Sequence, residues 1–379
     1  MPARVACVAT LILVAIGLAF PMGGAPGAAA RKPPHVKHVF IIVLENENAG
    51  VTFGPGSPAP YLATRLPAKG ELLPNYYAIA HNSNPNYLAM ISGQGPNAKT
   101  QADCPFYDNF APGIPTANGQ VLGTGCVYPR TVETVANQLE DSAYSWHGYM
   151  QDLNAGAPPG KQTPCRHPAL NSFDRTQTAK VGDQYASRHD PFVYFHSIID
   201  FPMCRRGVVD LSHLRKDLKR ERSTPSYSFI VPNLCNDGHD APCVDGRPGG
   251  LVSANGFLRR WAPRILRSPA YRDRGLLIVT FDEAEATGRG ADSSACCNEL
   301  QSPNTLTNGA QHPGPGGGRV GAVLVSPCIK AGTVVKAAYN HYSLLRSIED
   351  NFGLPHLGYA GQPGLRPFGS KVLDRRGCG

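Results

Sequence analysis

Residues 76–93 have the sequence YYAIAHNSNPNYLAMISG, an apolar run, a polar corner and a second apolar run. The first run, residues 76–80, predicts a strand, and the second, residues 87–91, predicts a helix. Pro85 is tolerated near the start of a helix because its missing N–H would have no partner there. We therefore expect Ser83 at a strand-to-helix corner, close to a helix N-terminus.

This corner gives Ser83 two alternative roles. Backbone N–H groups and the helix dipole favour an anion at a helix N-terminus, so a hydroxyl there can act as a nucleophile toward phosphate. A serine in such a place also commonly caps the helix. The stretch by itself leaves both roles open.

Other apolar runs predict the strands and helices around this corner. Continuous apolar runs are typical of strands covered on both faces, as in a parallel sheet. The predicted strands are residues 36–44, 144–150, 226–231, 276–281 and 320–326. Helical spacing is found at residues 60–68, 131–141 with Thr131 as cap, 211–218, 254–266 and 344–352. Residues 93–130 and 286–319 are rich in Gly, Pro and Asn and are predicted to be long loops.

Polar side chains follow three of the predicted strands. They are Glu45 and Asn46 after the first strand, Asp237, His239 and Asp240 after the strand at 226–231, and Asp282 and Glu283 after the strand at 276–281. In open α/β sheets the ligand site lies beyond the carboxyl ends of the strands. If these strands are parallel neighbours, their polar ends converge beside Ser83.

The side chains at these strand ends are suited to a divalent cation. Acidic groups after a buried strand are costly unless they are solvated, paired or bound to a cation. Carboxylate and amide oxygens suit a hard cation, whereas His239 and His341 suit zinc or another transition metal. A metal beside Ser83 would lower the pKa of its hydroxyl and offset charge on phosphorus. The alternative for residues 237–240 is a surface turn without metal, and His189 is open to either a substrate contact or a structural role.

The N-terminus and the cysteines indicate export. An apolar run follows Arg4 and ends in small residues, which predicts a signal peptide at residues 1–30 and a secreted or cell-surface protein. Ten cysteines remain after it, an even number that favours disulfides, and no pair has the CxxC spacing of zinc ribbons. We expect Cys104 and Cys126 to tie the first long loop, and Cys235 and Cys243 to close a short one.

The positive charge of the chain favours anionic partners. The formal net charge is +8, and it is +7 without Arg4. This excess favours anionic substrates or anionic lipid surfaces, with at most peripheral membrane contact. No nucleic-acid-binding motif is present, and the charge-dense residues 215–222 are expected to form a solvated helix face.

Taken together, six stretches resemble a known family. They are residues 38–46, 81–93, 185–195, 232–240, 276–283 and 341–360. They resemble the secreted phosphoesterase family that groups bacterial and fungal acid phosphatases with bacterial phospholipases C, within the alkaline-phosphatase-like superfamily. The small secreted acid phosphatases are the most similar members, because they share the serine-x-proline-asparagine stretch and the ending Asn340-His341-Tyr342-Ser343.

The resemblance implies a fold and a set of site residues. The fold is a three-layer α/β/α core with a mostly parallel sheet, formed by residues 31–379 as one catalytic domain. Ser83 is then the nucleophile, assisted by His81, His189 and His341, and a divalent metal is the cofactor. The implied metal ligands are Glu45, Asn46, Asp282, Glu283, Asp237, His239 and Asp240, and the implied substrate contacts are Asn86, Asn233 and His312.

Two positions depart from the family pattern. Asn82 stands where family members commonly have a proline, which affects how His81 is held. Glu283 follows Asp282, which leaves Asp282 the firmer metal ligand of the two.

The expected activity is that of an extracellular acid phosphatase acting through a phosphoserine at Ser83. Its substrate would be a phosphorylated small molecule or a lipid headgroup such as a phosphoinositide. A histidine that protonates the leaving alcohol would give a mildly acidic optimum. A phospholipase C is the first alternative, disfavoured by the lack of the long C-terminal region that many of these enzymes carry. An inactive surface binding protein is the second, and the presence of Ser83 with every acidic strand end argues against it.

Overall fold

The computed structural model describes residues 36–158, 160–288, 290–309, 314–369 and 372–373, together with Met1. The expected signal peptide at residues 1–30 and the expected substrate contact His312 lie outside the described residues. The described residues from Val36 onward belong to one compact unit. Within the described residues, no helix has the length and apolar character needed to cross a bilayer.

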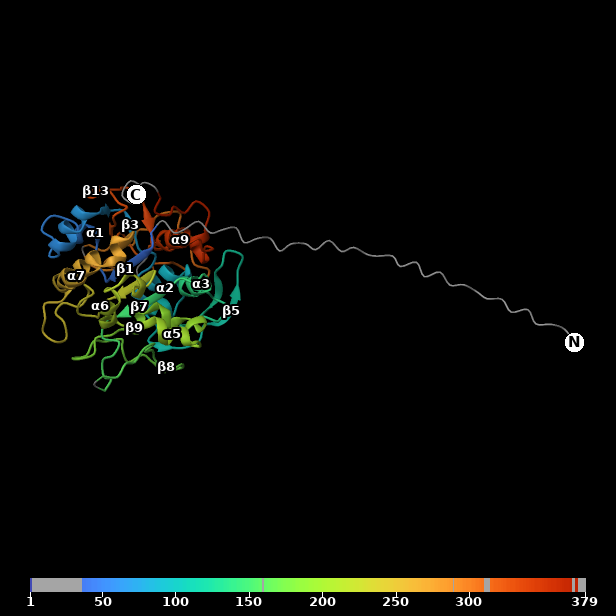
Figure 1. Cartoon of the computed structure of the whole chain (residues 1–379). Helices are drawn as coiled ribbons and strands as arrows, with labels where there is room; N and C mark the ends of the chain where they lie inside the picture. Colours follow the sequence, from blue (N-terminus) through green and yellow to red (C-terminus); the bar gives the residue numbers. More distant parts are fainter. Residues whose placement is uncertain (2–35, 159, 289, 310–313, 370–371, 374–379) are drawn as a thin grey trace. The chain divides into compact units, whose positions relative to one another are not determined.

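A parallel sheet forms the centre of this unit (Figure 1). Strand β1 (His38–Leu44) lies in its middle and pairs in parallel with β11 (Gly275–Phe281) on one side and β10 (Tyr227–Val231) on the other. Beyond β10 the sheet continues in parallel through β7 (Trp146–Met150) and β9 (Val208–Asp210). Every residue of β1, β10 and β11 is buried, which is why these strands are continuous apolar runs.

The other edge of the sheet holds its only described antiparallel strand. Strand β12 (Ala322–Val325) runs against both of its neighbours, β11 and β2 (Glu71–Leu73). Strand β13 (Thr333–Val334) then pairs in parallel with β2. The eight strands have the order β13-β2-β12-β11-β1-β10-β7-β9, so the expected mostly parallel sheet is confirmed.

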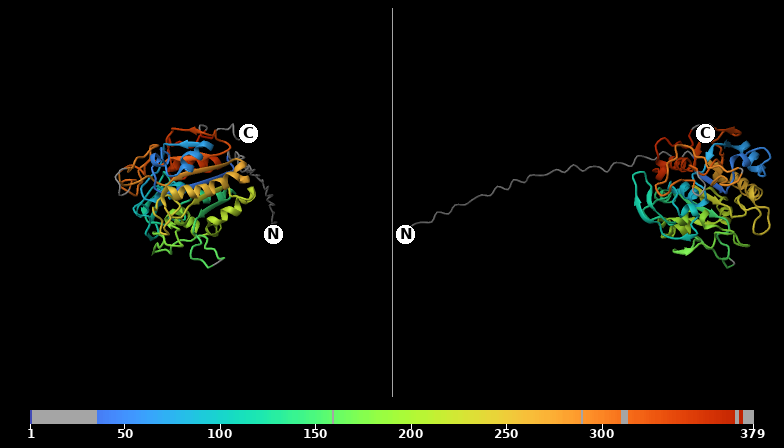
Figure 2. Two further views of the ribbon diagram at one scale, coloured as in Figure 1. Left: turned by 90° about the vertical axis from the view of Figure 1, so that its left-hand side faces the viewer. Right: turned by 180° about the vertical axis from the view of Figure 1, so that it is seen from behind.

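Helices cover both faces of the sheet (Figures 1 and 2). One face carries α7 (Gly250–Arg267), α8 (Pro269–Arg272) and α6 (Leu214–Asp217). The other carries α2 (Ser83–Ser92), which contacts α3 (Val135–Asp141) and α9 (His341–Phe352). The arrangement gives the expected three layers. Helix α7 is amphipathic, whereas every residue of α2 is buried.

The remaining elements are short. The helices are α1 (Ala49–Thr52), α4 (His196–Ile199) and α5 (Pro202–Gly207), and the turns of 3₁₀ or π helix are η1 (Tyr61–Arg65), η2 (Pro67–Lys69), η3 (Thr100–Ala102), η4 (Ser187–His189), η5 (Pro191–Tyr194), η6 (Leu211–His213), η7 (Glu221–Ser223) and η8 (Gly358–Gly361). The strand pairs outside the main sheet are β3 (Tyr76–Tyr77) with β14 (Tyr339–Asn340), β4 (Phe106–Tyr107) with β8 (Ser172–Phe173), and β5 (Ala111–Pro115) with β6 (Val121–Thr124).

Some predicted boundaries are wrong. Helix α3 is capped by Thr134 rather than Thr131, because Thr134 forms a reciprocal capping box with Asn137. The strand expected at residues 76–80 is only the two-residue β3. The first predicted loop contains β4, β5 and β6.

The disulfides expected from the sequence are confirmed. Cys104 is bonded to Cys126 and Cys235 to Cys243. Two further disulfides have pairings that the sequence left open: one joins Cys165 to Cys204, and one joins the adjacent residues Cys296 and Cys297.

Candidate active site

The corner before α2 is held by the amide of Asn86. Its Oδ1 accepts the backbone N–H groups of Ile79 and Ala80 at 3.0 and 3.1 Å, and its Nδ2 donates to the carbonyls of Ala80 and Asn82. Asn82 has a positive φ of 66°, which asparagine tolerates better than most residues and which proline cannot adopt. The departure from the family pattern at Asn82 therefore coincides with a distinct backbone conformation immediately before Ser83.

Ser83 is the first residue of α2, and its hydroxyl points at a carboxylate. The Oγ donates to Oε2 of Glu45 at 2.8 Å, and the residue is buried. The N-cap residue Asn82 makes no capping hydrogen bond, and Asp103 caps the helix instead: its Oδ1 accepts the N–H of Asn84 at 2.9 Å. The hydroxyl of Ser83 is thus engaged with the strand ends rather than with its own helix.

Backbone hydrogen bonds join the carboxyl ends of the three central strands. The N–H of Glu45 donates to the carbonyl of Asp237 at 2.9 Å, and the N–H of Asp282 donates to the carbonyl of Leu44 at 2.9 Å. The N–H of Asn46 donates to Oδ1 of Asp282 at 3.1 Å. The convergence inferred from the sequence is therefore present, because β10, β1 and β11 are adjacent and parallel.

His189 lies between two of these carboxylates. Its Nε2 is 3.2 Å from Oε1 of Glu45, and its Nδ1 is 3.8 Å from Oδ2 of Asp237. The ring stacks on Tyr87 of α2 with the centroids 5.2 Å apart. Burial, followed by the charges of Arg188 and His239, lowers the pKa of His189 well below its usual value, so the ring is neutral.

Glu283 holds the chain just before Ser83. Its Oε2 accepts from the His81 ring at 2.7 Å and from the N–H of Asn82 at 2.9 Å. The other ring nitrogen of His81 lies 2.9 Å from the hydroxyl of Ser293, in the second long loop. These contacts connect His81, the loop and the acidic strand end of β11.

His341 makes both of its ring contacts inside the protein. Its Nε2 is 2.6 Å from the carbonyl of Asp282, and its Nδ1 is 3.0 Å from the hydroxyl of Tyr76. Since a carbonyl only accepts, Nε2 carries the proton and Nδ1 accepts from Tyr76. Burial lowers the pKa of His341 to about 4. The geometry makes His341 a support for Asp282.

His239 is the site histidine that is open to solvent. The backbone N–H of His239 donates to Oδ1 of Asp237, and its ring Nδ1 lies 3.2 Å from Oδ1 of Asp240. The hydrogen bond to Asp240 raises the pKa of His239 to about 9, and the ring is about half exposed. It is therefore protonated near neutral pH.

The carboxylates of the site have an unfavourable environment when no cation is present. Burial raises the pKa of Glu45, Asp237, Asp282 and Glu283 well above the usual values, and neighbouring carboxylates add to the shift. Within the described residues, several buried atoms find no hydrogen-bond partner. Those at the site include Glu45 Oε1, Asp237 Oδ2, Asp282 Oδ2 and both ring nitrogens of His189. Three carboxylate oxygens and one neutral imidazole form a donor set that fits a divalent cation.

Another set of potential metal ligands has its atoms closer together. In the described part of the chain, only Cys235, Cys243 and Asp245 have potential ligand atoms that all lie within 4.8 Å of one another. Because Cys235 and Cys243 form a disulfide, they offer no thiolates to a metal. The donor set at the strand ends is more open, and its buried atoms without partners make it the better candidate.

Two of the expected substrate contacts are engaged elsewhere. Asn86 bonds to the backbone of its own corner, as described above. The Nδ2 of Asn233 donates to Oδ2 of Asp152 at 2.6 Å, and its Oδ1 accepts the N–H of Asn236 at 3.1 Å.

Asp103 and Arg188 were not expected at the site. Arg188 is 8% exposed, and its Nε lies 3.7 Å from Oδ2 of Asp103. Burial lowers the pKa of Arg188, but the charges of Asp103, Glu45 and Asp237 outweigh this effect and raise it, so Arg188 is a permanent cation beside the acidic strand ends. The position of Arg188 next to His189 was the available signal, whereas Asp103 gave none because it lies within the predicted loop at residues 93–130.

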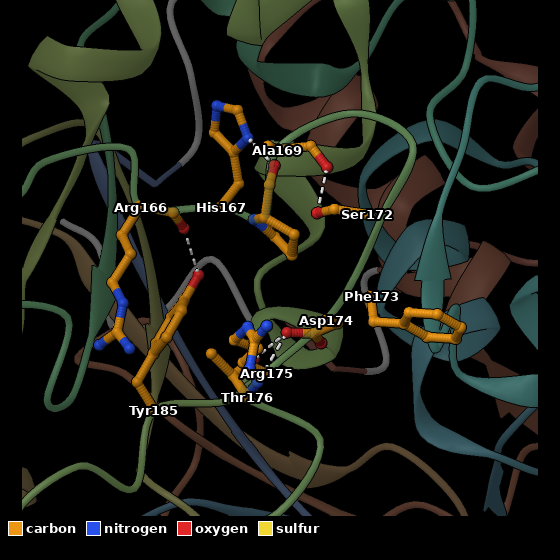
Figure 3. A pocket seen from close by; sticks show the side chains of 10 residues that line it. Arg166, His167, Ala169, Ser172, Phe173, Asp174, Arg175, Thr176 and Tyr185 are labelled. Carbon is orange, nitrogen blue, oxygen red and sulfur yellow. Dashed lines mark hydrogen bonds between the residues drawn. The ribbon is translucent and has the colours of Figure 1, made fainter.

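A pocket of about 270 Å³ is lined by residues 166–169 and 172–176 and by Tyr185 (Figure 3). Its wall includes Asp174 and Thr176, which hold the segment that carries Arg188 and His189. Oδ2 of Asp174 accepts from the hydroxyl of Ser187 at 2.8 Å, and Oγ1 of Thr176 accepts the N–H of Ser187 at 2.8 Å. The pocket wall thus supports the site from outside.

Comparisons with known proteins agree on one family. A family model described as the Phosphoesterase family matches residues 56–355. The phosphate-repressible acid phosphatase of Penicillium chrysogenum is 27% identical over 298 residues, which cover 78% of this chain and 55% of that protein. The phosphatidylinositol-3-phosphatase of Mycobacterium tuberculosis is 27% identical over 351 residues, which cover 92% and 88%. The chain spans about half the length of the fungal acid phosphatases that it matches.

Among solved structures, the crystal structure of Ps i-CgsB matches with a TM-score of 0.51. The match covers 89% of this chain and 76% of that one at 13% identity, and it shows a common fold.

Proposed function

This chain belongs to the Phosphoesterase family, and from that premise we propose that it is a phosphoric ester hydrolase that cleaves phosphate monoesters. The observation that supports this most directly is the 2.8 Å hydrogen bond from Ser83 to Glu45 at the meeting point of the acidic strand ends. The similarity to acid phosphatases and to a phosphatidylinositol-3-phosphatase supports phosphate monoesters, including lipid headgroups, as substrates. The disulfides are consistent with an extracellular protein.

The first chemical step in this proposal is attack of the Ser83 oxygen on phosphorus. The hydroxyl proton passes to Oε2 of Glu45, which already accepts the hydrogen bond of this hydroxyl at 2.8 Å. The bond between phosphorus and the alcohol oxygen breaks as the serine–phosphorus bond forms. The departing oxygen takes a proton from His239, which is protonated and open to solvent. Water then attacks the phosphoserine and gives a proton to the now neutral His239, while the Ser83 oxygen leaves with the proton held by Glu45; this releases inorganic phosphate and regenerates all three groups.

Other residues position these groups. Asp103 and Asn86 fix the start of α2, and His341 holds Asp282 through its carbonyl. Arg188 is a fixed positive charge near the place of the phosphoryl group. Members of this family are generally metal-dependent. Glu45, Asp237, Asp282 and His189 would hold a divalent cation, which when bound would offset the negative charge that develops on the phosphoryl oxygens.

A matched pair of serine variants tests the proposal. Ser83→Ala is expected to lower kcat on p-nitrophenyl phosphate by at least about 10³-fold, because it removes the nucleophile. Ser223→Ala, at a serine of η7 whose hydroxyl donates to the carbonyl of Asp217 ahead of the amino end of β10, is expected to keep full activity. Acid quenching after incubation with labelled substrate should trap a phosphoserine in the wild type and not in Ser83→Ala.

Two outcomes would contradict the proposal. Full activity of a folded Ser83→Ala variant would remove Ser83 as the nucleophile. Faster cleavage of bis(p-nitrophenyl) phosphate than of the monoester would make the chain a diesterase, as in the phospholipase C alternative. Circular dichroism of both variants shows whether any loss reflects unfolding.

A further inference from the structure

The hairpin of β5 and β6 presents apolar side chains to solvent. Ile114 and Leu122 are opposite each other in the strand register and are 53% and 37% exposed. The side chain of Asn304 joins the hairpin to the second long loop: its Oδ1 accepts the N–H of Gly123 at 2.9 Å, and its Nδ2 donates to the carbonyl of Val121 at 2.7 Å. The loop therefore lies directly against the hairpin.

The same loop adds two leucines to this surface. Leu306, two residues after Asn304, is fully exposed, and Leu300 is 40% exposed. Leu300 also lines a hollow of about 470 Å³ together with residues 117–119 of the hairpin turn. We call Ile114, Leu122, Leu300 and Leu306 the apolar face.

The segments around the apolar face have no charged side chains. Residues 109–129 and 300–309 contain no Asp, Glu, Lys or Arg, although 17% of the chain is charged. Protein surfaces in water normally mix both signs of charge, and a neutral surface with exposed leucines is a candidate interaction surface. Moving charges into a lipid interface is costly, whereas apolar side chains gain free energy there.

Hydrogen bonds connect the apolar face to the nucleophile. Nε2 of Gln101 donates to the carbonyls of Thr307 and Asn308 at 2.8 and 3.0 Å. The carbonyl of Gln101 accepts from the side chain of Asn82, the residue immediately before Ser83. One residue thus bridges the loop of Leu306 to the start of α2.

We propose that the apolar face docks on a lipid surface and that the enzyme acts there on phosphate esters anchored in the bilayer. This inference rests on the proposed function, because it assigns the substrate class of the same site. A lipid occupant is favoured over a protein because the two segments that carry the face have no charged side chains to pair with a partner's, while the net charge of +7 without Arg4 attracts the chain to anionic lipids. Figure 1 shows β5 at the edge of the molecule, in a position to reach a surface.

Two triple variants test the inference. The test variant is Ile114→Ser/Leu122→Ser/Leu306→Ser. The control is Val51→Ser/Val252→Ser/Val334→Ser, which changes side chains that are 50%, 52% and 55% exposed on α1, α7 and β13. Those elements lie on the side away from β5 in Figure 1 and in the rear view of Figure 2.

The readout is cosedimentation with vesicles of phosphatidylcholine and phosphatidylglycerol. The wild type and the control are expected to bind, and the test variant to bind at least about tenfold more weakly, because three apolar side chains no longer enter the interface. Hydrolysis of soluble p-nitrophenyl phosphate is expected to be the same in all three. Hydrolysis of a phosphoinositide in vesicles is expected to fall only in the test variant.

Several results would overturn the inference. They are absence of vesicle binding by the wild type, equal binding by the test variant, and equal loss in the control. So would light scattering that shows a dimer dissociated by the test substitutions without any vesicle binding, since the face would then join two copies of the chain. Lack of activity on the soluble ester would instead contradict the proposed function, because vesicle binding is measured independently of turnover.

Discussion

Burial determines the protonation chemistry of individual carboxyl groups in this protein. At the site, the buried carboxylates face one another and a buried arginine. Away from it, Glu349 of α9 is fully buried, and its Oε1 accepts the N–H of Leu357 at 2.8 Å. Burial raises the pKa of Glu349 from its ordinary value of 4.5 to about 8. This single side chain should therefore make stability depend on pH.

The sign of that dependence follows from the raised pKa. The folded state retains the proton between pH 4.5 and 8 while the unfolded chain releases it, so the stabilisation present below pH 4.5 is lost as pH rises to 8. The contribution of Glu349 falls by up to about 1.4 kcal/mol per pH unit in this window. Glu349→Gln removes the titrating carboxyl and therefore this pH dependence, while the amide oxygen of the new glutamine can still accept the N–H of Leu357.

Urea unfolding at pH 5, 6, 7 and 8 checks this prediction. The free energy of unfolding of Glu349→Gln is expected to increase relative to the wild type at each step. Glu133→Gln, at an exposed glutamate, is the matched control and should parallel the wild type. A constant difference between Glu349→Gln and the wild type over the series would disprove the assignment.

At the scale of elements, the corner before α2 determines where the nucleophile lies. Helix α2 is buried on every side, so water cannot hydrogen-bond to the unpaired backbone groups at its ends. Four hydrogen bonds from one amide, that of Asn86, hold the turn. Because one side chain holds this corner, substitutions of Asn86 are expected to lower the stability of the fold.

Replacement of Asn86 separates a structural role from a substrate contact. Asn86→Ala leaves buried backbone groups of Ile79 and Ala80 unpaired and is expected to lower the free energy of unfolding by about 2–4 kcal/mol. Asn86→Asp keeps the two accepted bonds but sets a carboxylate oxygen against the carbonyls of Ala80 and Asn82, so a loss is expected that becomes smaller at low pH, where a protonated carboxyl can donate. Thermal unfolding and steady-state kinetics measure both. An unchanged stability with a raised KM would show that Asn86 contacts substrate instead.

At the scale of the whole molecule, the tertiary structure brings together the donor set for a cation. Its members come from three strand ends and from the segment that leads into η5. A ligand that binds only the folded chain stabilises it, by about 2.7 kcal/mol at a concentration of 100 Kd. We therefore expect a divalent cation to raise the Tm of metal-free protein by several degrees.

Asp282→Asn distinguishes this binding from a nonspecific salt effect. In metal-free protein the substitution is expected to leave Tm equal or higher, because it removes one of four crowded carboxylates. With cation present the variant should gain little. Asp240→Asn, at the carboxylate paired with His239, is expected to retain the cation-dependent shift. A titration with Mg²⁺, Mn²⁺, Ca²⁺ and Zn²⁺ in which none raises the wild-type Tm would refute the cation site.

How well the sequence predicts an element depends on the length of that element. The long apolar runs of β1, β10 and β11 were predictable because strands buried on both faces have no polar alternation. The short β3 and the hairpin of β5 and β6 were not, because two to five residues carry too little periodicity. The cap of α3 was misplaced by three residues, since two threonines precede that helix and only the fold shows which one reaches Asn137.

The sequence by itself determined the fold class, the two short-range disulfides and the residues that follow each central strand. These features depend on apolar runs, on strand ends, and on cysteines that lie 22 and 8 residues apart. Only the tertiary structure decided that His341 supports Asp282, that Asn86 holds a corner and that Asp103 and Arg188 lie beside Ser83. Those contacts join residues far apart in the chain, and their geometry is set by strand order and helix packing, which local sequence does not specify.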